Sequence, residues 1–276
     1  PPQAGRLDPA VATDMGGNYY RPALARVHHE GFAGHADACA PGILARLAPV
    51  RERGGLVLEL GCGSGALTRH LVAAGHRVVA TDASPAMVAL AREAVPGAEA
   101  VRRLTLPDDP LPAADAIVSV GHVLSYLPDV RSIGRALRAI AAALRPGGVV
   151  AFDLLDRAYR AARAGKEPVA AFGGDWAVFI AFASPDSATY VRDIATFVRN
   201  EDGTWRRDDE RHVNVLVDAA ELAGRLTTAG LEEVEVARGF DARQQMEEGL
   251  VAITGVRRPA AETSRGFEPR AVTNPS

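Results

Sequence analysis

Hydrophobic positions in the middle of the chain follow two alternating patterns. Short, uninterrupted apolar runs predict buried strands at residues 56–60, 77–82, 98–104, 114–121 and 148–155. Apolar residues with i, i+3, i+4 spacing predict helices between these strands at residues 66–75, 84–95 and 130–144. Strands that alternate with helices in this way predict a parallel sheet covered by helices on both faces.

Helical spacing also precedes the first predicted strand. Residues 20–51 carry two apolar stripes, and Pro41 and Gly42 are predicted to separate them into two helices.

The pattern changes after Leu155. Between residues 175 and 217 the apolar period becomes two, which predicts antiparallel strands, and Asp202-Gly203 predicts a hairpin turn. A helix over 218–230 and two closing strands over 231–240 and 249–258 then complete the chain. We therefore predict an α/β domain with a β-rich insertion after the fifth strand.

Composition limits the function. The 276 residues are 47% hydrophobic and 24% charged with a net charge of −3, which predicts a globular protein with no basic surface for nucleic acid or membrane. Cys39 and Cys62 are too few for a disulfide framework or a Cys-rich zinc site, so we predict no metal and a reducing, cytoplasmic location. Abundant Ala and Arg indicate a bacterial source.

The segment LELGCGSGAL (58–67) carries the strongest functional signal. A buried strand ends in three alternating glycines and a helix begins at once, so a ligand can approach the backbone and its free N–H groups. Asp82 ends the next strand, where a carboxylate can bind a ribose diol. The loop also fits the dinucleotide fingerprint as Gly61-x-Gly63-x-x-Ala66, but Glu59 opposes NAD because a carboxylate repels a pyrophosphate.

These motifs resemble those of class I S-adenosylmethionine-dependent methyltransferases. The family's acidic-x-G-x-G-x-G motif matches 59–65, its segment after the fourth strand matches 119–129, and its L-x-P-G-G turn matches 144–148. The resemblance implies a Rossmann-like, doubly wound sheet of seven strands in the order 3-2-1-4-5-7-6. One departure is that Leu104 and Thr105 stand where many members have an acid near the adenine amine.

The resemblance also implies S-adenosylmethionine as cofactor and a set of residues that bind it. Tyr20 is expected to reach the cofactor from an N-terminal helical lid, and backbone carbonyls near Gly61 and Gly121 are expected to meet the methionine ammonium. The full expected set is Tyr20, Glu59, Gly61, Cys62, Gly63, Gly65, Asp82, Ala83, Met87, Leu104, Thr105 and Gly121.

Candidate catalytic residues are His122, His29 and Asp153. His122 directly follows the fourth strand and either contacts the reactants or caps the next turn. Adjacent helical positions point about 100° apart, so only one of His28 and His29 faces the pocket, and we predict His29. Asp153 lies near the end of the fifth strand and either holds substrate or caps a loop.

Other charged residues and histidines leave alternatives open. Strand alternation places Arg192 and Asp193 on opposite faces, so only one of them points inward. His212 is either functional or a solvated strand residue. We predict surface or loop positions for three further histidines, namely His35, His70 and His76.

We predict that the protein transfers a methyl group from S-adenosylmethionine to an oxygen or nitrogen atom of a small molecule, as a monomer or homodimer. A role in natural-product biosynthesis fits the insertion and the bacterial composition. The alternatives are a protein of this fold that binds the cofactor without methyl transfer, as in cyclisation or decarboxylation, and an NAD-dependent oxidoreductase.

The expected domain organisation is a single methyltransferase domain over residues 15–258 between two flexible tails. Its parts are a helical lid (15–53), a cofactor-binding half (54–155), a β-rich substrate wall (156–217) and a closing helix with two strands (218–258), and the tails are residues 1–14 and 259–276.

Overall fold

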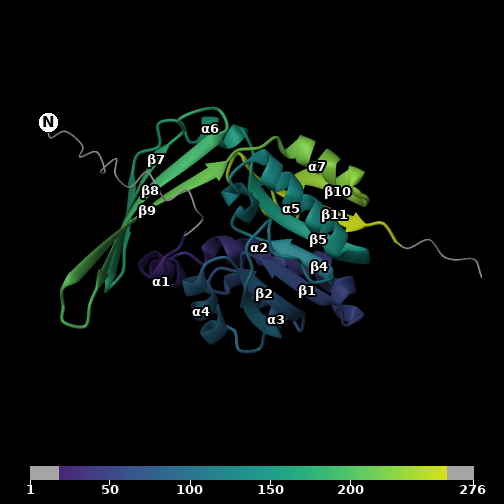
Figure 1. The fold of residues 1–276 in the computed structure, drawn as a ribbon, viewed down its shortest axis with the longest axis horizontal. Helices are drawn as coiled ribbons and strands as arrows, with labels where there is room; N and C mark the ends of the chain where they lie inside the picture. Colours follow the sequence, from purple (N-terminus) through teal and green to yellow (C-terminus); the bar gives the residue numbers. More distant parts are fainter. Residues whose placement is uncertain (1–18, 260–276) are drawn as a thin grey trace, which may run out of the picture.

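Two separate sheets organise the chain in the computed structural model, which describes residues 19–259 (Figure 1). The larger sheet has seven strands in the order β3-β2-β1-β4-β5-β11-β10. Its strands are β1 (Leu56–Leu60), β2 (Arg77–Asp82), β3 (Ala100–Arg103), β4 (Ala114–Ser119), β5 (Leu144–Leu155), β10 (Leu231–Ala237) and β11 (Leu250–Arg257). β1 to β5 pair in parallel, and β11 runs antiparallel to both β5 and β10. The predicted strand order is confirmed.

Helices cover both faces of the large sheet because each carries one apolar stripe. α2 (Gly34–Glu52) and α3 (Ala66–Ala73) share one buried cluster, whereas α5 (Val130–Ala143) and α7 (Ala219–Thr228) share another. α4 (Pro85–Ala94) begins at Ser84, whose side chain accepts a hydrogen bond from the backbone of Met87.

The N-terminal helices divide at a different point from the one predicted. α1 (Pro22–Gly31) ends before Phe32, and α2 runs through Pro41 and Gly42, which were predicted to separate the two helices. A Cβ atom on Gly42 would lie 2.8 Å from Phe240, so this glycine permits close packing and does not mark a break. Pro41 removes one backbone hydrogen bond from α2, but burial of Ile43 and Leu47 further along stabilises the helix by more, so the helix continues.

The insertion forms the second sheet, which is antiparallel as predicted. Its strands are β6 (Val169–Phe172), β7 (Trp176–Ala183), β8 (Thr189–Arg199) and β9 (Trp205–Val215), and the short helix α6 (Ala158–Ala162) leads into it. β8 and β9 form the hairpin that turns at Gly203, whose φ is +83°. In Figure 1 this sheet stands beside the large sheet, with α1 close to its strands. The insertion therefore adds a wall without interrupting the large sheet.

The described residues contain no helix of the length and apolarity needed to cross a membrane. The predicted tail 1–14 and all but the first residue of the tail 259–276 lie outside the described residues.

Candidate functional site

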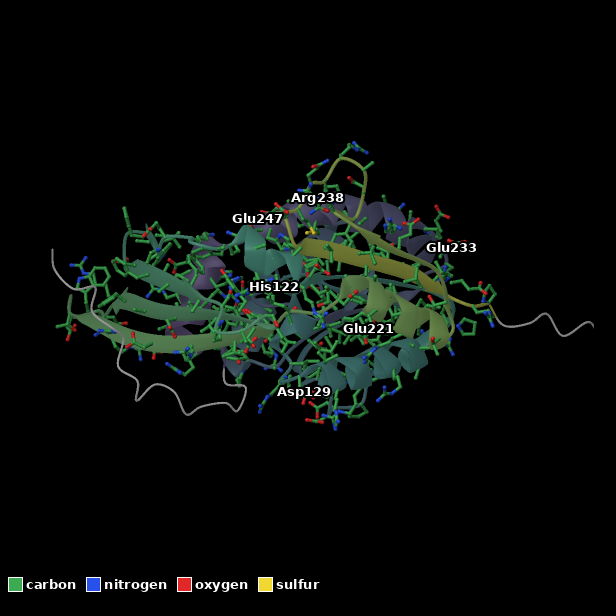
Figure 2. All side chains as sticks on the ribbon, turned by 90° about the horizontal axis from the view of Figure 1, so that it is seen from above. His122, Asp129, Glu221, Glu233, Arg238 and Glu247 are labelled. Carbon is green, nitrogen blue, oxygen red and sulfur yellow. The ribbon has the colours of Figure 1, made fainter. Side chains whose placement is uncertain are left out.

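A cavity of about 1000 Å³ opens between the carboxyl edge of the large sheet, the N-terminal helices and the small sheet. These three regions are distant in sequence. The strands of the large sheet contribute together because parallel strands present their carboxyl ends at one edge. Figure 2 shows His122 in the middle of the molecule, whereas Asp129 and Glu233 lie at its periphery.

The loop between β1 and α3 uses its three glycines in different ways. All have positive φ, with values of +67° for Gly61, +54° for Gly63 and +91° for Gly65. A Cβ atom on Gly61 would overlap Val123 at 2.3 Å, and one on Gly65 would meet Val95 at 2.7 Å, whereas one on Gly63 would meet nothing within 4 Å. Gly63 therefore leaves bare backbone facing the cavity.

Two carboxylates flank this loop. Glu59 is buried, accepts a hydrogen bond of 2.7 Å from the Thr68 hydroxyl, and has its pKa raised to about 7 by burial. Asp82 accepts hydrogen bonds from the backbone N–H groups of Gly63 and Ser84 at 2.9 and 2.8 Å, and burial raises its pKa. Both residues line the cavity. Each oxygen of Asp82 keeps a second lone pair with which it can accept a hydrogen bond from a ligand hydroxyl.

The end of β4 is fixed by Asp153 of the neighbouring strand. The Asp153 carboxylate is fully buried and accepts N–H groups from Gly121 at 3.1 Å, from His122 at 2.6 Å and from the ring of His35 at 2.6 Å. Burial opposes ionisation of Asp153, but the hydrogen bond and charge of His35 outweigh it and lower the pKa. Asp153 does not line the cavity, so its contact with the site is through His35, Gly121 and His122.

Gly121 and His122 both adopt left-handed backbone conformations. Their φ values are +97° and +49°, and a Cβ atom on Gly121 would meet nothing within 4 Å. The His122 ring stacks on Tyr126 with a centroid distance of 5.6 Å. Burial and then the charge of Arg192 lower the pKa of His122 to about 3. His122 is therefore a neutral imidazole in the cavity at physiological pH.

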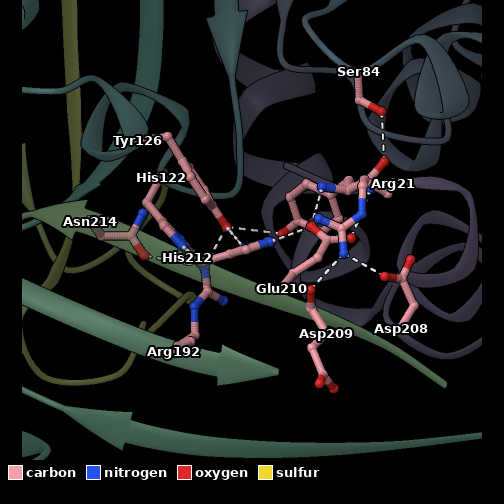
Figure 3. A network of polar contacts seen from close by, with 11 residues as sticks. Arg21, Ser84, His122, Tyr126, Arg192, Asp208, Asp209, Glu210, His212 and Asn214 are labelled. Carbon is pink, nitrogen blue, oxygen red and sulfur yellow. Dashed lines mark hydrogen bonds and ion pairs between the residues drawn. The ribbon is translucent and has the colours of Figure 1, made fainter. Parts of the chain in front are cut away.

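A hydrogen-bond network joins the start of the lid to the small sheet (Figure 3). The Glu210 carboxylate on β9 accepts the backbone N–H groups of Tyr20 and Arg21 at 2.7 and 2.8 Å, and also the Nε2 proton of His212 at 2.9 Å. His212 Nδ1 then accepts from the Tyr126 hydroxyl at 3.3 Å. Because Tyr126 donates to His212, it accepts from the Tyr20 hydroxyl at 3.0 Å. The lid is thus held by contacts to β9 and to the 3-10 helix η2 (Val123–Tyr126).

Most of the expected cofactor residues line this cavity. Gly65 is the exception, and a Cβ atom at this position would meet Val95. The residues that do line the cavity are Tyr20, Glu59, Gly61, Cys62, Gly63, Asp82, Ala83, Met87, Leu104, Thr105 and Gly121.

Two of the predictions for the N-terminal segment are corrected. Tyr20 precedes α1, with φ of +55°, and does not begin the helix. The prediction that His29 faces the pocket is wrong: His28 lines the cavity and His29 is exposed. The rotation of 100° per residue is as assumed, but Val27 and Leu24 face the core and bring His28 to the inner side.

Several functional residues were missed or left open by the sequence. His35 was predicted to be at the surface, yet it lines the cavity and contacts Asp153; His76, given the same prediction, is buried. His212 is fully buried and not solvated, and Arg192, unlike Asp193, faces the cavity. Tyr126 belongs to the 119–129 motif segment, which was the available signal for it.

One group of possible metal ligands occurs among residues 19–259, formed by His35, Cys39 and Asp153 with ligand atoms within 4.8 Å. These side chains already bond to one another and to the backbone: Asp153 holds three N–H donors, and Cys39 accepts from Gln244 at 3.1 Å. The group is satisfied as a hydrogen-bonded cluster.

The model of the methyltransferase domain family matches residues 32–236, well over half of the chain. The chain belongs to this methyltransferase family. A malonyl-[acyl-carrier protein] O-methyltransferase of Pectobacterium atrosepticum is 38% identical over 99 residues, which cover 36% of this chain and 38% of that protein. The alignment therefore spans well under half the length of that curated relative.

Solved structures agree on the methyltransferase fold. An S-adenosylmethionine-dependent methyltransferase from Clostridium acetobutylicum has a TM-score of 0.69 at 17% identity, covering 86% of this chain and 98% of its own. An S-adenosylmethionine-bound amino pentose methyltransferase from Micromonospora echinaspora has a TM-score of 0.63 at 20% identity, covering 87% and 98%.

The cavity of this methyltransferase fits S-adenosylmethionine as cofactor. Bare backbone at Gly63 and Gly121 leaves room where any side chain would fill the cavity. Asp82, with lone pairs that remain open, and the buried carboxyl of Glu59 line the same cavity. A compact ligand with a ribose and an ammonium matches these groups, whereas a pyrophosphate beside Glu59 would be repelled.

Proposed function

We propose that this enzyme transfers a methyl group from S-adenosylmethionine to an oxygen or nitrogen atom of a small molecule. The observation that carries the proposal is the cavity that joins the glycine loop and Asp82 to two neutral imidazoles, His28 of the lid and His122 after β4, and to phenols of the lid and the small sheet. A small acceptor enclosed there would lie beside the cofactor site and away from bulk water.

The cofactor side of the cavity is assigned residue by residue. Asp82 would accept hydrogen bonds from the ribose hydroxyls, Gly63 and Gly121 would allow backbone contact, and Met87 and Leu104 would provide apolar surface for the adenine. Thr105 cannot offer its amide, because that N–H already donates to Asp109 at 2.7 Å. When bound, S-adenosylmethionine supplies an electrophilic methyl group whose leaving group departs neutral.

The chain's own residues position the acceptor. Aligning two reactants lowers the activation free energy by about 7–11 kcal/mol at best. In this cavity the alignment depends on side chains whose own positions are fixed by further hydrogen bonds. His122 is fixed by Asp153 through its backbone N–H. Its neutral ring accepts at Nε2 from Arg192 at 3.4 Å, so Nδ1 carries the ring proton and can donate to an oxygen of the acceptor. His28 is a second neutral imidazole: burial and the charge of Arg192 lower its pKa to about 4, and its Nδ1 atom has no partner.

The names of two similar proteins bear on the acceptor. The Pectobacterium protein is named as an O-methyltransferase, and the Micromonospora protein as an amino pentose methyltransferase involved in calicheamicin biosynthesis. We include a role in natural-product biosynthesis in the proposal on the strength of the second similarity and of the added β wall.

The first experiment is thermal unfolding with S-adenosylhomocysteine, S-adenosylmethionine and NAD in parallel. A ligand at 100 times its dissociation constant adds roughly 2.7 kcal/mol to the free energy of unfolding. We expect both adenosyl ligands to raise the melting temperature and NAD to leave it unchanged. A shift with NAD alone would contradict the proposal.

The second experiment separates binding from transfer. A panel of hydroxyl and amine acceptors is incubated with the enzyme, and products are sought by their mass gain of one methyl group. We expect His122→Ala to keep the S-adenosylhomocysteine shift while losing product, whereas Asp82→Ala loses the shift itself. The exposed Asp175→Asn is the matched control and keeps both. Cofactor binding with no product from any acceptor would favour a protein of this fold that does not transfer methyl groups.

A further inference from the structure

The guanidinium of Arg192 lies in the cavity without an acidic partner. It comes from β8 of the small sheet, and its Nη2 atom donates to the Tyr126 hydroxyl, to Asn214 Oδ1 at 3.2 Å and to His122 Nε2 at 3.4 Å. Its Nε atom is buried and has no hydrogen-bond partner. Among residues 19–259 no carboxylate forms an ion pair with it. A partly buried cation with only neutral neighbours is costly unless a ligand supplies the opposite charge.

The carboxylates that line the cavity are engaged elsewhere. Glu59 bonds to Thr68, Asp82 holds two backbone amides, and Glu247 pairs with Arg163. Glu210, on the same face of the small sheet, is occupied by two lid amides and His212. The charge of Arg192 therefore acts on its surroundings, and after burial it is the largest cause of the lowered pKa of His28, His122 and His212.

The side chains around Arg192 indicate which other groups of the acceptor would be bound. Phe182 is its register partner on β7 and stacks on Tyr190 with a centroid distance of 6.1 Å, and all three line the cavity. The ammonium of Lys166 lies 4.8 Å from the centre of the Phe182 ring, and among the described residues it too forms no ion pair. The acceptor wall thus offers two cations beside an aromatic surface.

We propose that the acceptor of this enzyme carries an oxyanion, a carboxylate or a phosphoryl group, and that Arg192 binds it. A guanidinium presents planar N–H donors that match either group. This inference rests on the proposed function of the cavity, since it concerns the second ligand of the same site. It makes Arg192 a specificity-determining residue that selects anionic acceptors over their neutral analogues.

The test compares matched anionic and neutral probes on the full chain saturated with S-adenosylhomocysteine. Benzoate and phenyl phosphate are titrated against benzamide by calorimetry and by thermal unfolding. A hydrogen bond to a charged group contributes about 1.5–3 kcal/mol, so we expect at least one anion to bind roughly 10- to 100-fold more tightly than the amide. The affinities of benzoate and phenyl phosphate show whether the site prefers a carboxylate or a phosphoryl group.

Variants assign the effect to Arg192. We expect Arg192→Met to remove the preference for the anion, Arg192→Lys to keep part of it, and the exposed Arg206→Gln to leave it unchanged. The proposal is overturned if benzamide binds as well as both anions, if neither anion binds at millimolar concentration, or if Arg192→Met retains the preference. If Arg192→Met does not fold, Arg192→Lys and the comparison of probes on the unmodified enzyme decide.

Failure of this inference is distinguishable from failure of the proposed function. S-adenosylhomocysteine that stabilises the protein while anions show no preference would refute only the oxyanion site. S-adenosylhomocysteine that gives no stabilisation would refute the proposed function itself.

Discussion

His35 Nε2 lies 2.6 Å from Asp153 Oδ2 and joins helix α2 to strand β5 across 118 residues of sequence. This contact sets the geometry of the site, because the same carboxylate also holds the backbone N–H groups of Gly121 and His122. A residue in the N-terminal lid therefore helps to fix the loop that follows β4.

The first prediction concerns the pH dependence of stability. Burial alone lowers the pKa of His35, but the hydrogen bond and charge of Asp153 raise it from 6.5 to about 10. Since the folded-state pKa exceeds the unfolded value, the stabilisation is complete below pH 6.5 and is lost as pH rises toward 10. The pKa of Asp153 is lowered, so its contribution is present above pH 3.8 and is lost on further acidification.

We therefore expect the melting temperature of the unmodified protein to exceed that of His35→Gln most at pH 5–6, with the difference shrinking between pH 6.5 and 10. Thermal unfolding over this range is the measurement, and His70→Gln is the matched control, because His70 is as exposed as His35 but pairs with the exposed Asp37. A difference that does not change with pH would show that His35 is neutral in the folded protein.

The second prediction separates backbone strain from ligand contact. Gly63 and Gly75 both have positive φ and open space at the Cβ position, but only Gly63 lines the cavity. Alanine at either position in a left-handed conformation costs about 1–2 kcal/mol. We expect Gly63→Ala and Gly75→Ala to lose similar stability, whereas only Gly63→Ala loses the S-adenosylhomocysteine shift. Equal retention of the shift in both variants would remove Gly63 from the cofactor site.

The third prediction uses the two adjacent histidines of α1. His28 lines the cavity and His29 is exposed, so they form a matched pair on one helix. We expect His28→Asn to lower kcat/KM by roughly 10- to 100-fold through misplacement of the acceptor, and His29→Asn to change it by less than about twofold. Steady-state kinetics with an acceptor from the mass screen is the measurement. Loss of activity in His29→Asn would restore the original prediction for that residue.

The fourth prediction concerns the attachment of the lid. Removing the carboxyl of Glu210 leaves the backbone N–H groups of Tyr20 and Arg21 without this acceptor, at a cost of about 1–3 kcal/mol. We expect Glu210→Ala to lower the melting temperature and to speed dissociation of S-adenosylhomocysteine, measured by stopped-flow fluorescence. Glu201→Ala, at the exposed tip of the same hairpin, should change neither. Unchanged dissociation in Glu210→Ala would mean that the lid does not control ligand exchange.

The sequence predicted the large sheet well, and most of the residues expected to bind the cofactor line one cavity, because both sets follow from local patterns. Apolar runs define β1 to β5, and Gly63 and Asp82 stand at fixed positions after them. Two predictions about the lid failed for reasons of packing. Pro41 normally ends a helix, but burial beyond it continues α2, and His35 becomes a site residue only because α2 lies against β5.

The acceptor side could not be predicted because it is built from contacts between distant segments. Strand alternation showed that either Arg192 or Asp193 faces inward, yet which one does depends on how the whole small sheet stands against the cavity. Likewise, Glu210 occurs within a run of mixed charges, and nothing local distinguishes it from its exposed neighbours.

The small sheet shares no strand pairing with the large one. The glycine loop and Arg192 therefore belong to separate sheets, and β7 to β9 can change in sequence without altering the strand register that positions the glycine loop. Substitutions in the small sheet can therefore change which acceptor binds without disturbing the half of the cavity proposed to hold the methyl donor. Tyr126 and Glu210 carry hydrogen bonds that tie the small sheet to η2 and to the start of the lid.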